Sequence, residues 1–471
     1  MKSPLSRARW ALLSVLAAVP GWAFETNVLT RDPSTIIKRD GVYWVYGTGK
    51  GTEQFSSTDR VNWQKRGPVF PTVPSWVAAA VPANIGNGVW APDVRKINDK
   101  YFLYYSYSTF GSNTSGIGVA VNETLEPTKW VDQGVVINTT AQDHFNAIDP
   151  CIFEDAEGHF WLVFGSYFSG IKLVSINPAT GKRADDKIFN LATRPDTPPN
   201  AIEAPAIEFH DGYYYLFVNW DNCCAGGKSA YNIRVGRSKS VTGPYVDKAG
   251  KDMMKGGGSL FLNAVYDDGS GRVVDEQIGP GHAGILHDVD GDWVSTHYEW
   301  AHDKKGATTM NLNKLAWDSD GWPRVLLDAG PYKIVSNLGT HGVASVVGGA
   351  ENSGAPLETS TDVRSQSQKW TLHHRGDGYY QIIHAGSKKA LALVGCDAKE
   401  GTKVELAMPT DADCQSWYFQ QNEDGTYTLL TKLSKKAVAL DVASCLLLDG
   451  TPIQTWLSNG LNCQKWTLRL R

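Results

Sequence analysis

The chain has 471 residues, which is long enough for two or three domains and a large buried core. Its formal net charge of −4 gives no electrostatic reason to expect nucleic acid or an anionic membrane as a partner. Aromatic residues make up 11% of the chain and include 17 tryptophans, a content that suits stacking on sugar rings but is also normal for a β-rich core. A neutral ligand fits this composition better than a charged one.

The N-terminus has the pattern of a targeting segment. Basic residues precede an apolar run over 10–19, and small residues follow at 21–23, where a cleavage site would lie. The run is too short to cross a bilayer, and no later stretch approaches the roughly 20 apolar residues that a spanning helix needs. We therefore expect residues 1–23 to be a signal peptide and the mature chain to be secreted, with no membrane partner.

One short pattern recurs five times in the first 300 residues: a proline or glycine turn beside a polar residue, then a hydrophobic strand, a tight turn and an aromatic strand. A repeat of about 50 to 80 residues built from short strands predicts a β-propeller, in which the starts of equivalent strands meet at one axis. Asp32, Asp149 and Glu203 would then share one pocket. The five turns are Arg31-Asp32-Pro33, Trp90-Ala91-Pro92, Ile148-Asp149-Pro150, Glu203-Ala204-Pro205 and Gly279-Pro280-Gly281-His282.

A second, independent repeat follows. Each copy opens with a strand that begins at a tyrosine and closes with Gln-x-Trp, and three copies of about 47 residues predict a threefold β-trefoil. Turn residues at 328–331 separate the two units, and helical periodicity is nearly absent. We predict an all-β chain, with a propeller over 24–330 and a trefoil over 331–471. The closing motifs are Gln368-Lys369-Trp370, Gln415-Ser416-Trp417 and Gln464-Lys465-Trp466.

Seven cysteines agree with an oxidising compartment. Two pairs in the second repeat have the same separation of 18 positions and predict two local disulfides, each worth on the order of 3 kcal/mol. In the first unit, three free thiols, or one vicinal disulfide with one thiol, both fit, since adjacent cysteines bridge only with a strained backbone. No Cys/His set has the spacing of a metal cluster. The expected pairs are Cys396 with Cys414 and Cys445 with Cys463, and the first unit holds Cys151, Cys223 and Cys224.

The three carboxylates suit the hydrolysis of an acetal. That reaction needs one carboxylic acid to protonate the leaving oxygen and one carboxylate to activate water or attack. A third carboxylate near the acid raises its pKa by like-charge repulsion. An aspartate before proline can also simply cap a turn. Glu203 differs, because it lies in the apolar stretch 201–207, where an unpaired carboxylate is costly to bury.

These turns resemble the blade motifs of glycoside hydrolase family 43, most closely its arabinanases, over about residues 25 to 330. The resemblance implies a five-bladed propeller that works with inversion of configuration. Asp32 resembles the general base, Glu203 the general acid, and Asp149 the residue that tunes the pKa of the acid and orients it. Inversion implies that base and acid stand roughly 6.5–9.5 Å apart, which leaves room for a water molecule.

Other positions gain roles from the same resemblance. Trp90 is expected to stack on a furanose ring, with core packing as the alternative, and His282 to lie near calcium or another ion on the propeller axis, coordinated largely by water. No organic cofactor is expected. Similar Cys-Cys-x-Gly loops in related arabinanases favour a vicinal disulfide that shapes the rim of the cleft. The residues that resemble substrate-contacting positions are Trp90, Phe110, Asn146, Ser166 and Tyr167.

Residues 332–471 resemble ricin-type lectins and carbohydrate-binding modules of family 13. In that family, each binding repeat carries an aspartate and, further on, a glutamine with an aromatic platform. The third copy keeps this pattern, with Asp441, Gln454 and Trp456. The second copy has Ala392 in place of the aspartate, and the first has no acidic residue over 343–346. A trefoil with one weak sugar site, or none, remains the alternative.

The resulting hypothesis is a secreted, monomeric glycoside hydrolase that cleaves α-1,5-linked L-arabinofuranosyl bonds in plant cell-wall arabinan and arabino-oligosaccharides, with endo-action as the leading mode. An exo-acting arabinofuranosidase or a β-xylosidase of the same family is the nearest alternative. A non-catalytic glycan-binding protein is another. The three carboxylates argue against that last reading, because aromatic and amide groups hold a neutral sugar at a smaller desolvation cost.

Overall fold

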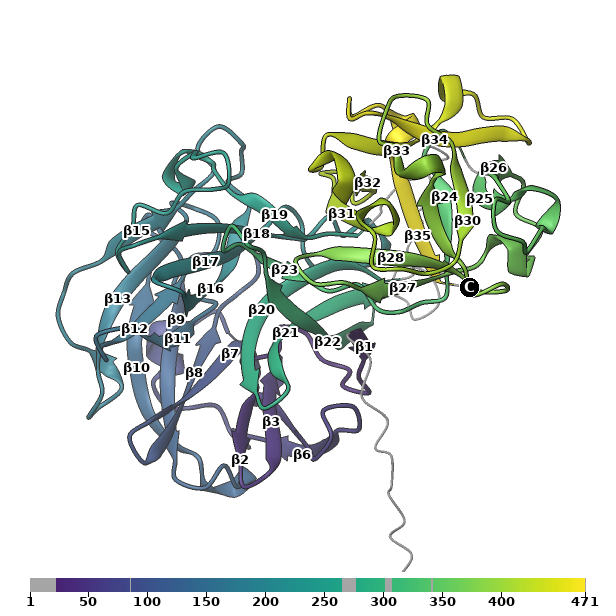
Figure 1. Ribbon diagram of the computed structural model, residues 1–471. Coiled ribbons are helices and arrows are strands. Elements are labelled where there is room, and N and C mark those ends of the chain that lie inside the picture. Colours follow the sequence, from purple (N-terminus) through teal and green to yellow (C-terminus); the bar gives the residue numbers. More distant parts are fainter. Residues whose placement is uncertain (1–22, 85, 265–276, 301–306, 340–341, 471) are drawn as a thin grey trace, which may run out of the picture.

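A computed structural model describes residues 23–84, 86–264, 277–300, 307–339 and 342–470. Figure 1 shows two bodies: a ring of twisted sheets, coloured purple to teal, and a smaller unit in green and yellow. In the described residues, helix is limited to α1 (Val77–Ala80) and to single 3-10 turns, so the predicted all-β class is confirmed. No described helix has the length and apolar character needed to cross a membrane.

The larger body is a five-bladed propeller of antiparallel sheets, each with its first strand at the inner edge. Blade 1 contains β2 (Ile37–Arg39), β3 (Val42–Gly47), β5 (Glu53–Ser57) and β6 (Gln64–Pro68). Blade 2 contains β7 (Gly88–Ile97), β8 (Lys100–Tyr107), β9 (Ser115–Asn122) and β10 (Val131–Thr139), with β4 (Gly49–Lys50) beside β7. Blade 3 contains β11 (Cys151–Glu154), β12 (Phe160–Phe164), β13 (Ile171–Asn177), β14 (Lys182–Arg183) and β15 (Phe189–Ala192).

The N-terminal strand closes the ring. Blade 4 contains β16 (Ile202–His210), β17 (Tyr213–Trp220), β18 (Asn232–Ser238) and β19 (Ser259–Leu262). Blade 5 contains β20 (Gln277–Asp288), β21 (Gly291–Trp300), β22 (Thr308–Trp317) and the short β23 (Pro323–Val325). Strand β1 (Ala23–Glu25) pairs antiparallel with β22, so blade 5 combines strands from both ends of the domain. This pairing was not predicted from the sequence.

The aromatic runs form strands that are buried on both faces. Each blade lies between two others, so β8 buries every residue after its first, and β17 buries its six central residues. A continuous hydrophobic run is therefore favoured there over the alternation of a half-exposed sheet. One core cluster extends from blade 3 through blade 4 to blade 5 and includes Val163, Leu216, Phe217, Ile285 and Val294.

The smaller body is the predicted trefoil, and its Gln-x-Trp motifs have a structural role. Each motif tryptophan is fully buried and donates its indole N–H to a backbone carbonyl at 3.0–3.2 Å. Each motif glutamine accepts the backbone N–H of the residue five positions earlier at 2.8–3.0 Å. The same contacts recur in all three copies, so the repeat encodes the fold and not, by itself, a sugar site.

The trefoil sheet is closed by the pairing of its first and last strands, β24 (Tyr332–Ser336) and β35 (Trp466–Leu470). Both predicted disulfides of this domain are formed, Cys396 with Cys414 and Cys445 with Cys463. The other strands are β25 (Val343–Val346), β26 (Leu357–Ser360), β27 (Trp370–His374), β28 (Tyr379–His384), β29 (Ala390–Leu393), β30 (Val404–Ala407), β31 (Trp417–Gln421), β32 (Tyr427–Thr431), β33 (Val438–Val442) and β34 (Thr451–Leu457).

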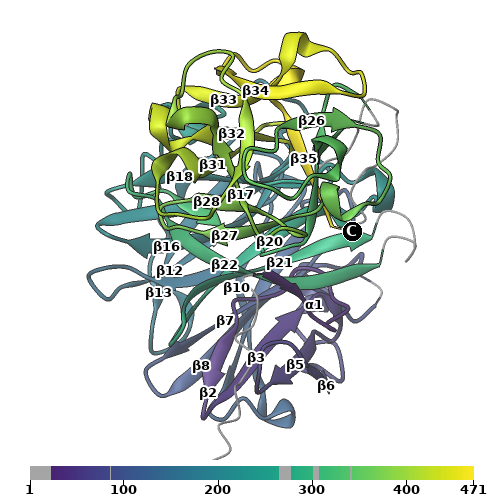
Figure 2. The ribbon, with the colours of Figure 1, turned by 45° about the vertical axis from the view of Figure 1, so that its right-hand side comes forward.

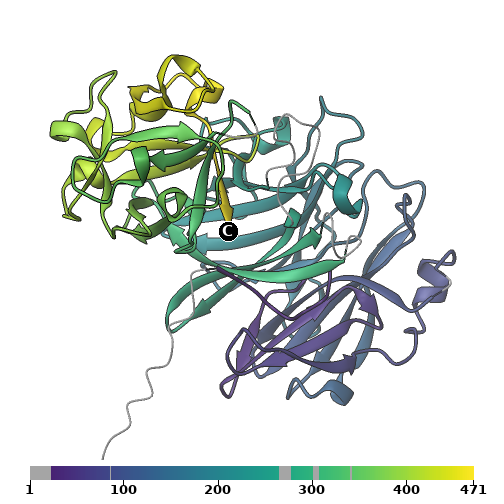
Figure 3. The same ribbon diagram turned by 90° about the vertical axis from the view of Figure 1, so that its right-hand side faces the viewer.

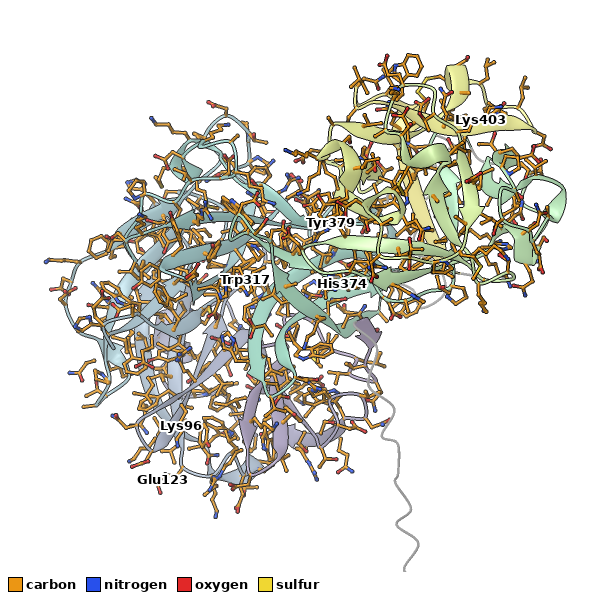
Figure 4. All side chains as sticks on the ribbon, in the orientation of Figure 1. Lys96, Glu123, Trp317, His374, Tyr379 and Lys403 are labelled. Atoms are coloured by element: carbon orange, nitrogen blue, oxygen red, sulfur yellow. A yellow bond between two sulfur atoms is a disulfide. The ribbon has the colours of Figure 1, made fainter. Side chains whose placement is uncertain are left out.

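The two domains meet directly. In Figure 2, β27 and β28 lie over β20 and β22, and in Figure 3 the trefoil lies on the opposite side of the propeller from blade 1. Arg324 donates to the carbonyl of Phe419 at 3.1 Å and lies over the ring of Tyr418. Its guanidinium occupies the space that a Cβ on Gly378 would take. Figure 4 shows Trp317 on the propeller side of this junction, and His374 and Tyr379 on the trefoil side.

Candidate active site

Each blade has one residue with a left-handed backbone near the start of its first strand or in the turn before it. The equivalent positions are Asp32, Ala91, Asp149, Ala204 and His282, with φ values of 49°, 43°, 57°, 48° and 59°. This conformation is uncommon for residues other than glycine. Asp32, Asp149 and His282 therefore project from equivalent positions, whereas Glu203 lies one residue earlier in its blade, at the position of Trp90 in blade 2. The motif proline follows in the first four blades and Ala283 in the fifth.

The five left-handed residues are linked by hydrogen bonds that run around the ring. The backbone N–H of each left-handed residue donates a hydrogen bond to a side chain of the preceding blade. In four of the five bonds, the accepting residue lies near the end of the second strand of that blade. Blade 3 has Gly165 at the equivalent position, which offers no side chain, and there the Asp149 carboxylate is the acceptor. The bonds run from Ala91 to Thr48 (2.8 Å), Asp149 to Ser106 (3.2 Å), Ala204 to Asp149 (3.1 Å), His282 to Asn219 (3.0 Å) and Asp32 to His297 (3.1 Å).

Asp32 is held from both sides. Thr48 donates its hydroxyl to Oδ2 at 2.6 Å, and the Asp32 amide donates to Nδ1 of His297. Nδ1 of His282 lies 3.8 Å from Oδ1. Burial lowers the pKa of His297 to about 4 and also lowers the pKa of His282, against the effect of Asp32, so both rings are neutral near pH 7. Neither histidine therefore forms a charged ion pair with Asp32.

Glu203 and Asp149 both have raised pKa values. Burial raises the pKa of Asp149, and the nearby Glu203 and Asp32 raise it further. Burial also raises the pKa of Glu203, while hydrogen bonds from Ser166 and Tyr231 partly oppose that rise. The Ser166 hydroxyl donates to Oε2 of Glu203 at 2.7 Å. Two buried carboxyl groups beside a third cannot all ionise cheaply, so the pair presents one carboxylic acid close to the Asp32 carboxylate.

Asp93 fixes the spacing between the first and third blades. It is buried in β7, and its two carboxylate oxygens accept the backbone N–H groups of Thr35 and Ile152, both at 2.9 Å. These are the third residues after Asp32 and Asp149. One side chain from blade 2 thus ties together the strand starts that carry two of the three carboxylates. Asp93 directly follows the Trp90-Ala91-Pro92 turn, and no role was predicted for it.

The residues expected to contact substrate are placed differently from one another. The Ser166 hydroxyl contacts Glu203, and the Tyr167 amide donates to the carbonyl of Ile202, next to Glu203. Asn146 is buried, and its Oδ1 has no hydrogen-bond partner among the described residues, as expected of an atom that awaits a ligand. Phe110 is 90% exposed in the loop after β8, and Trp90 is half-buried at the start of β7. An exposed aromatic ring in this position is free to stack on a sugar.

The vicinal disulfide favoured by the resemblance is formed between Cys223 and Cys224. Its loop is anchored on Glu299, a fully buried carboxylate that accepts the amides of Cys224 and Gly226 and the hydroxyl of Ser229. Cys151 is a buried free thiol, and burial raises its pKa well above the ordinary value. It is therefore a poor nucleophile.

Several residues of this site have no motif in the sequence. Thr48, Ser106, Asn219 and His297 end second strands, and Tyr231 lies in a loop before β18. Strand register would have found the first four, because each pairs with the residue that precedes a left-handed position. Nothing in the sequence around Tyr231 distinguishes it from a core tyrosine.

Two family models match the chain. The model described as glycosyl hydrolases family 43 matches residues 26–323, and the one described as ricin-type beta-trefoil lectin domain-like matches 317–407 and 413–471. The chain belongs to glycosyl hydrolase family 43. The predicted family, the five-bladed propeller and the ricin-type trefoil are therefore confirmed.

Individual relatives match the family 43 domain. An extracellular endo-alpha-(1->5)-L-arabinanase of Bacillus subtilis is 42% identical over 302 residues, covering 63% of this chain and 88% of its own. An extracellular exo-alpha-(1->5)-L-arabinofuranosidase of Cellvibrio japonicus is 38% identical over 347 residues, covering 68% and 94%. The solved structure of a family 43 endo-arabinanase from Bacillus licheniformis is 43% identical with a TM-score of 0.58, covering 64% of this chain and 99% of that one.

The raised pKa of Asp149 predicts a stability effect with a defined sign. A carboxyl group whose folded pKa lies above its unfolded value stabilises the fold fully below the unfolded pKa, and this contribution is lost as the pH rises through the folded pKa. Asp149→Asn removes the charge but keeps an acceptor for Ala204. We expect the melting temperature of this variant to equal that of the wild type at about pH 4 and to exceed it at neutral pH. We also expect the variant to lose activity.

Thermal melts across this pH range test the prediction, with Asp59→Asn as a control of opposite sign. Burial by itself raises the pKa of Asp59. Hydrogen bonds from Asn62 and neighbouring groups outweigh burial and lower this pKa to about 2. Asp59→Asn should therefore lose stability at neutral pH. A melting temperature for Asp149→Asn that falls relative to wild type as the pH rises would contradict the expectation.

Proposed function

We propose that this protein is an endo-acting arabinanase that hydrolyses α-1,5-L-arabinofuranosyl bonds with inversion. One observation carries the proposal: three carboxyl groups from blades 1, 3 and 4 interact in one site, where burial and charge repulsion raise the pKa of both Asp149 and Glu203. Membership of family 43 and the names of the arabinan-degrading relatives support the same substrate. Carbohydrate substrates also fit the ricin-type trefoil.

The roles follow from the environment of each carboxylate. Asp32, oriented by Thr48 and His297, removes a proton from the attacking water. Glu203 donates its proton to the leaving glycosidic oxygen and becomes a carboxylate, which Ser166 and Tyr231 then stabilise. Asp149 shares the buried site, where burial, Glu203 and Asp32 raise its pKa. A hydrogen bond from the Ala204 amide fixes its orientation. We assign to it the tuning and orientation of the acid. Asn146, Tyr167, Trp90 and Phe110 are proposed to bind the arabinofuranosyl units.

Exo-action is the second candidate, because the Cellvibrio relative is named as an exo-acting arabinofuranosidase. Product analysis on linear arabinan distinguishes the two. An endo-enzyme should first release a series of oligosaccharides, and proton NMR should show the inverted anomer. A single short product from the earliest time points would make the endo assignment wrong.

The same assay tests Glu203. Glu203→Gln should reduce hydrolysis of arabinan by about a hundredfold to ten-thousandfold, the usual range of general acid–base catalysis, and leave oligosaccharide affinity largely intact. Glu208→Gln is a matched control, since Glu208 lies on the same strand but outside the site, hydrogen-bonded to His287. Near wild-type turnover by Glu203→Gln would remove the general-acid role.

A cation near the propeller axis is proposed to be held by His282. The residues fit this role: the ring is buried and neutral, so a nitrogen lone pair is available to an ion, and Asp32 supplies negative charge nearby. In the described residues, no set of three ligating side chains surrounds His282, which agrees with a shell made largely of water. Such an ion would add positive charge that stabilises the carboxylate cluster.

Metal analysis after exhaustive dialysis should find about one equivalent of calcium or another cation per chain, as expected of a single site. His282→Ala should lose that cation and show no melting-temperature response to calcium. His373→Ala, an exposed position on β27 of the trefoil, serves as the control. Equal metal content in wild type and His282→Ala would exclude this residue as a ligand.

The third trefoil copy is proposed to bind sugar. Asp441 is buried and accepts a hydrogen bond from Gln454 at 3.1 Å, and Trp456, two residues along the same strand, is 40% exposed. A carboxylate, an amide and an open indole face form a suitable small site for a neutral sugar. Lys403, whose backbone pairs with Gln454, lies at the end of the trefoil away from the propeller in Figure 4, so we place this site at that end.

Trp456→Ala should weaken retention on insoluble arabinan about tenfold, the loss expected for one stacking contact, without changing kcat on soluble oligosaccharides. Leu461→Ala, another exposed apolar position of the same copy, is the control. Unchanged retention in Trp456→Ala, measured by depletion from the supernatant, would favour a trefoil without sugar affinity.

Export is also proposed. The basic and apolar N-terminal segment precedes the first described strand, and the Bacillus and Cellvibrio relatives are named as extracellular. Three disulfides among the described residues are consistent with an oxidising compartment.

A further inference from the structure

We propose that Tyr231 is a positioning residue for the general acid, and that its phenol and the Ser166 hydroxyl form a two-donor cradle for the Glu203 carboxylate. The inference rests on the acid role of Glu203 proposed above. Tyr231 belongs to no blade motif and lies in the loop before β18. It is 2% exposed, and its side chain hydrogen-bonds to Glu203. Ser166 reaches Oε2 of the same carboxylate from the loop between β12 and β13 of blade 3.

The glycines of blade 5 make room for this tyrosine. A Cβ added to Gly281 would lie 2.2 Å from Cε1 of Tyr231, and one added to Gly279 would lie 3.5 Å from its Cβ. Gly281 takes the position that Glu203 and Trp90 occupy in their blades. A side chain at Gly281 would displace the phenol from the acid. The Gly-Pro-Gly sequence before His282 therefore leaves the space that Tyr231 of blade 4 occupies.

The ring of Tyr231 also faces the general base. It stacks against His297 with an interplanar angle of 13° and a centroid distance of 5.9 Å. His297 accepts the backbone N–H of Asp32, so one stacked pair contacts the elements that carry both the acid and the base. A shift of this pair would change both sides of the cleft together.

The chemistry of the two donors matches the needs of an acid. After Glu203 gives its proton to the leaving oxygen, a carboxylate remains in a buried site beside Asp32 and Asp149, and hydrogen bonds from neutral donors favour that charged form. Burial and the three carboxylates raise the pKa of Tyr231 well above its ordinary value, so the phenol keeps its proton and acts as a donor. Two further titratable groups lie nearby: Tyr167, whose pKa burial and Glu203 raise to about 12, and His297, whose pKa burial lowers to about 4.

The pH profile of kcat/KM on arabino-oligosaccharides tests the proposal, because its basic limb reports the acid of the free enzyme. Tyr231→Phe removes the donor and keeps the ring. Without it the carboxylate is less favoured, so the basic limb should move to higher pH by about one unit, and activity should fall about tenfold. Ser166→Ala should act in the same direction, and the double variant should move the limb further. The acidic limb should stay in place.

Tyr245→Phe is the matched control. Tyr245 is fully buried in the same blade, and its hydroxyl donates to the carbonyl of Val241 at 2.9 Å. This variant should lower the melting temperature as Tyr231→Phe does and leave the pH profile unchanged. A Tyr231→Phe profile that superimposes on wild type would overturn the proposal and leave Tyr231 a packing residue. If Glu203→Gln instead keeps near wild-type turnover, the acid assignment itself is wrong, so the two failures are distinguishable.

Discussion

The catalytic geometry depends on one repeated hydrogen bond, the one from the left-handed residue of each blade to a side chain of the blade before it. A left-handed backbone at a residue other than glycine costs about 1–3 kcal/mol and persists where its surroundings hold it in place. Five such residues at the strand entries are held by neighbours in the ring. The carboxylates of Asp32 and Asp149 are therefore positioned by contacts between blades. Pairing of β1 with β22 completes the same ring at its outer strands.

The ring also gives Asp149 two tasks. Gly165 leaves blade 3 without the acceptor side chain that the other blades supply, and a Cβ there would lie 2.7 Å from the carbonyl of Gly170. The Asp149 carboxylate fills the gap by accepting the amide of Ala204, the residue that follows Glu203. The contact that closes the ring in blade 3 thereby places a buried carboxyl group near Glu203, the proposed acid. One side chain thus completes the ring and carries the proposed tuning of the acid, at a cost to stability when it ionises.

The features that were predicted correctly are those encoded by repeated local motifs. Five turns before strands gave the propeller and its three carboxylates, and three Gln-x-Trp copies gave the trefoil. Equal cysteine spacing gave two disulfides. Aligning the blades by strand register would have found His297, but no local pattern points to Tyr231 or to the role of Asp93, because those contacts arise from packing between blades. Ser166 was predicted to contact substrate, and the structure places its hydroxyl on Glu203, a partner that no local pattern specifies.

The junction between the domains bears on how the trefoil acts. The connecting segment is itself paired with the trefoil: Leu327 donates to the Tyr380 hydroxyl, and Leu372 donates to the carbonyl of Ala329. Arg324 adds contacts that fill the space over Gly378. A module held in this way has little of the freedom of a flexible linker, whose reach would average over many orientations. Sugar bound at Trp456 would therefore be presented in a fixed relation to the cleft, and the distance between the two sites would set which polysaccharide segments reach Glu203.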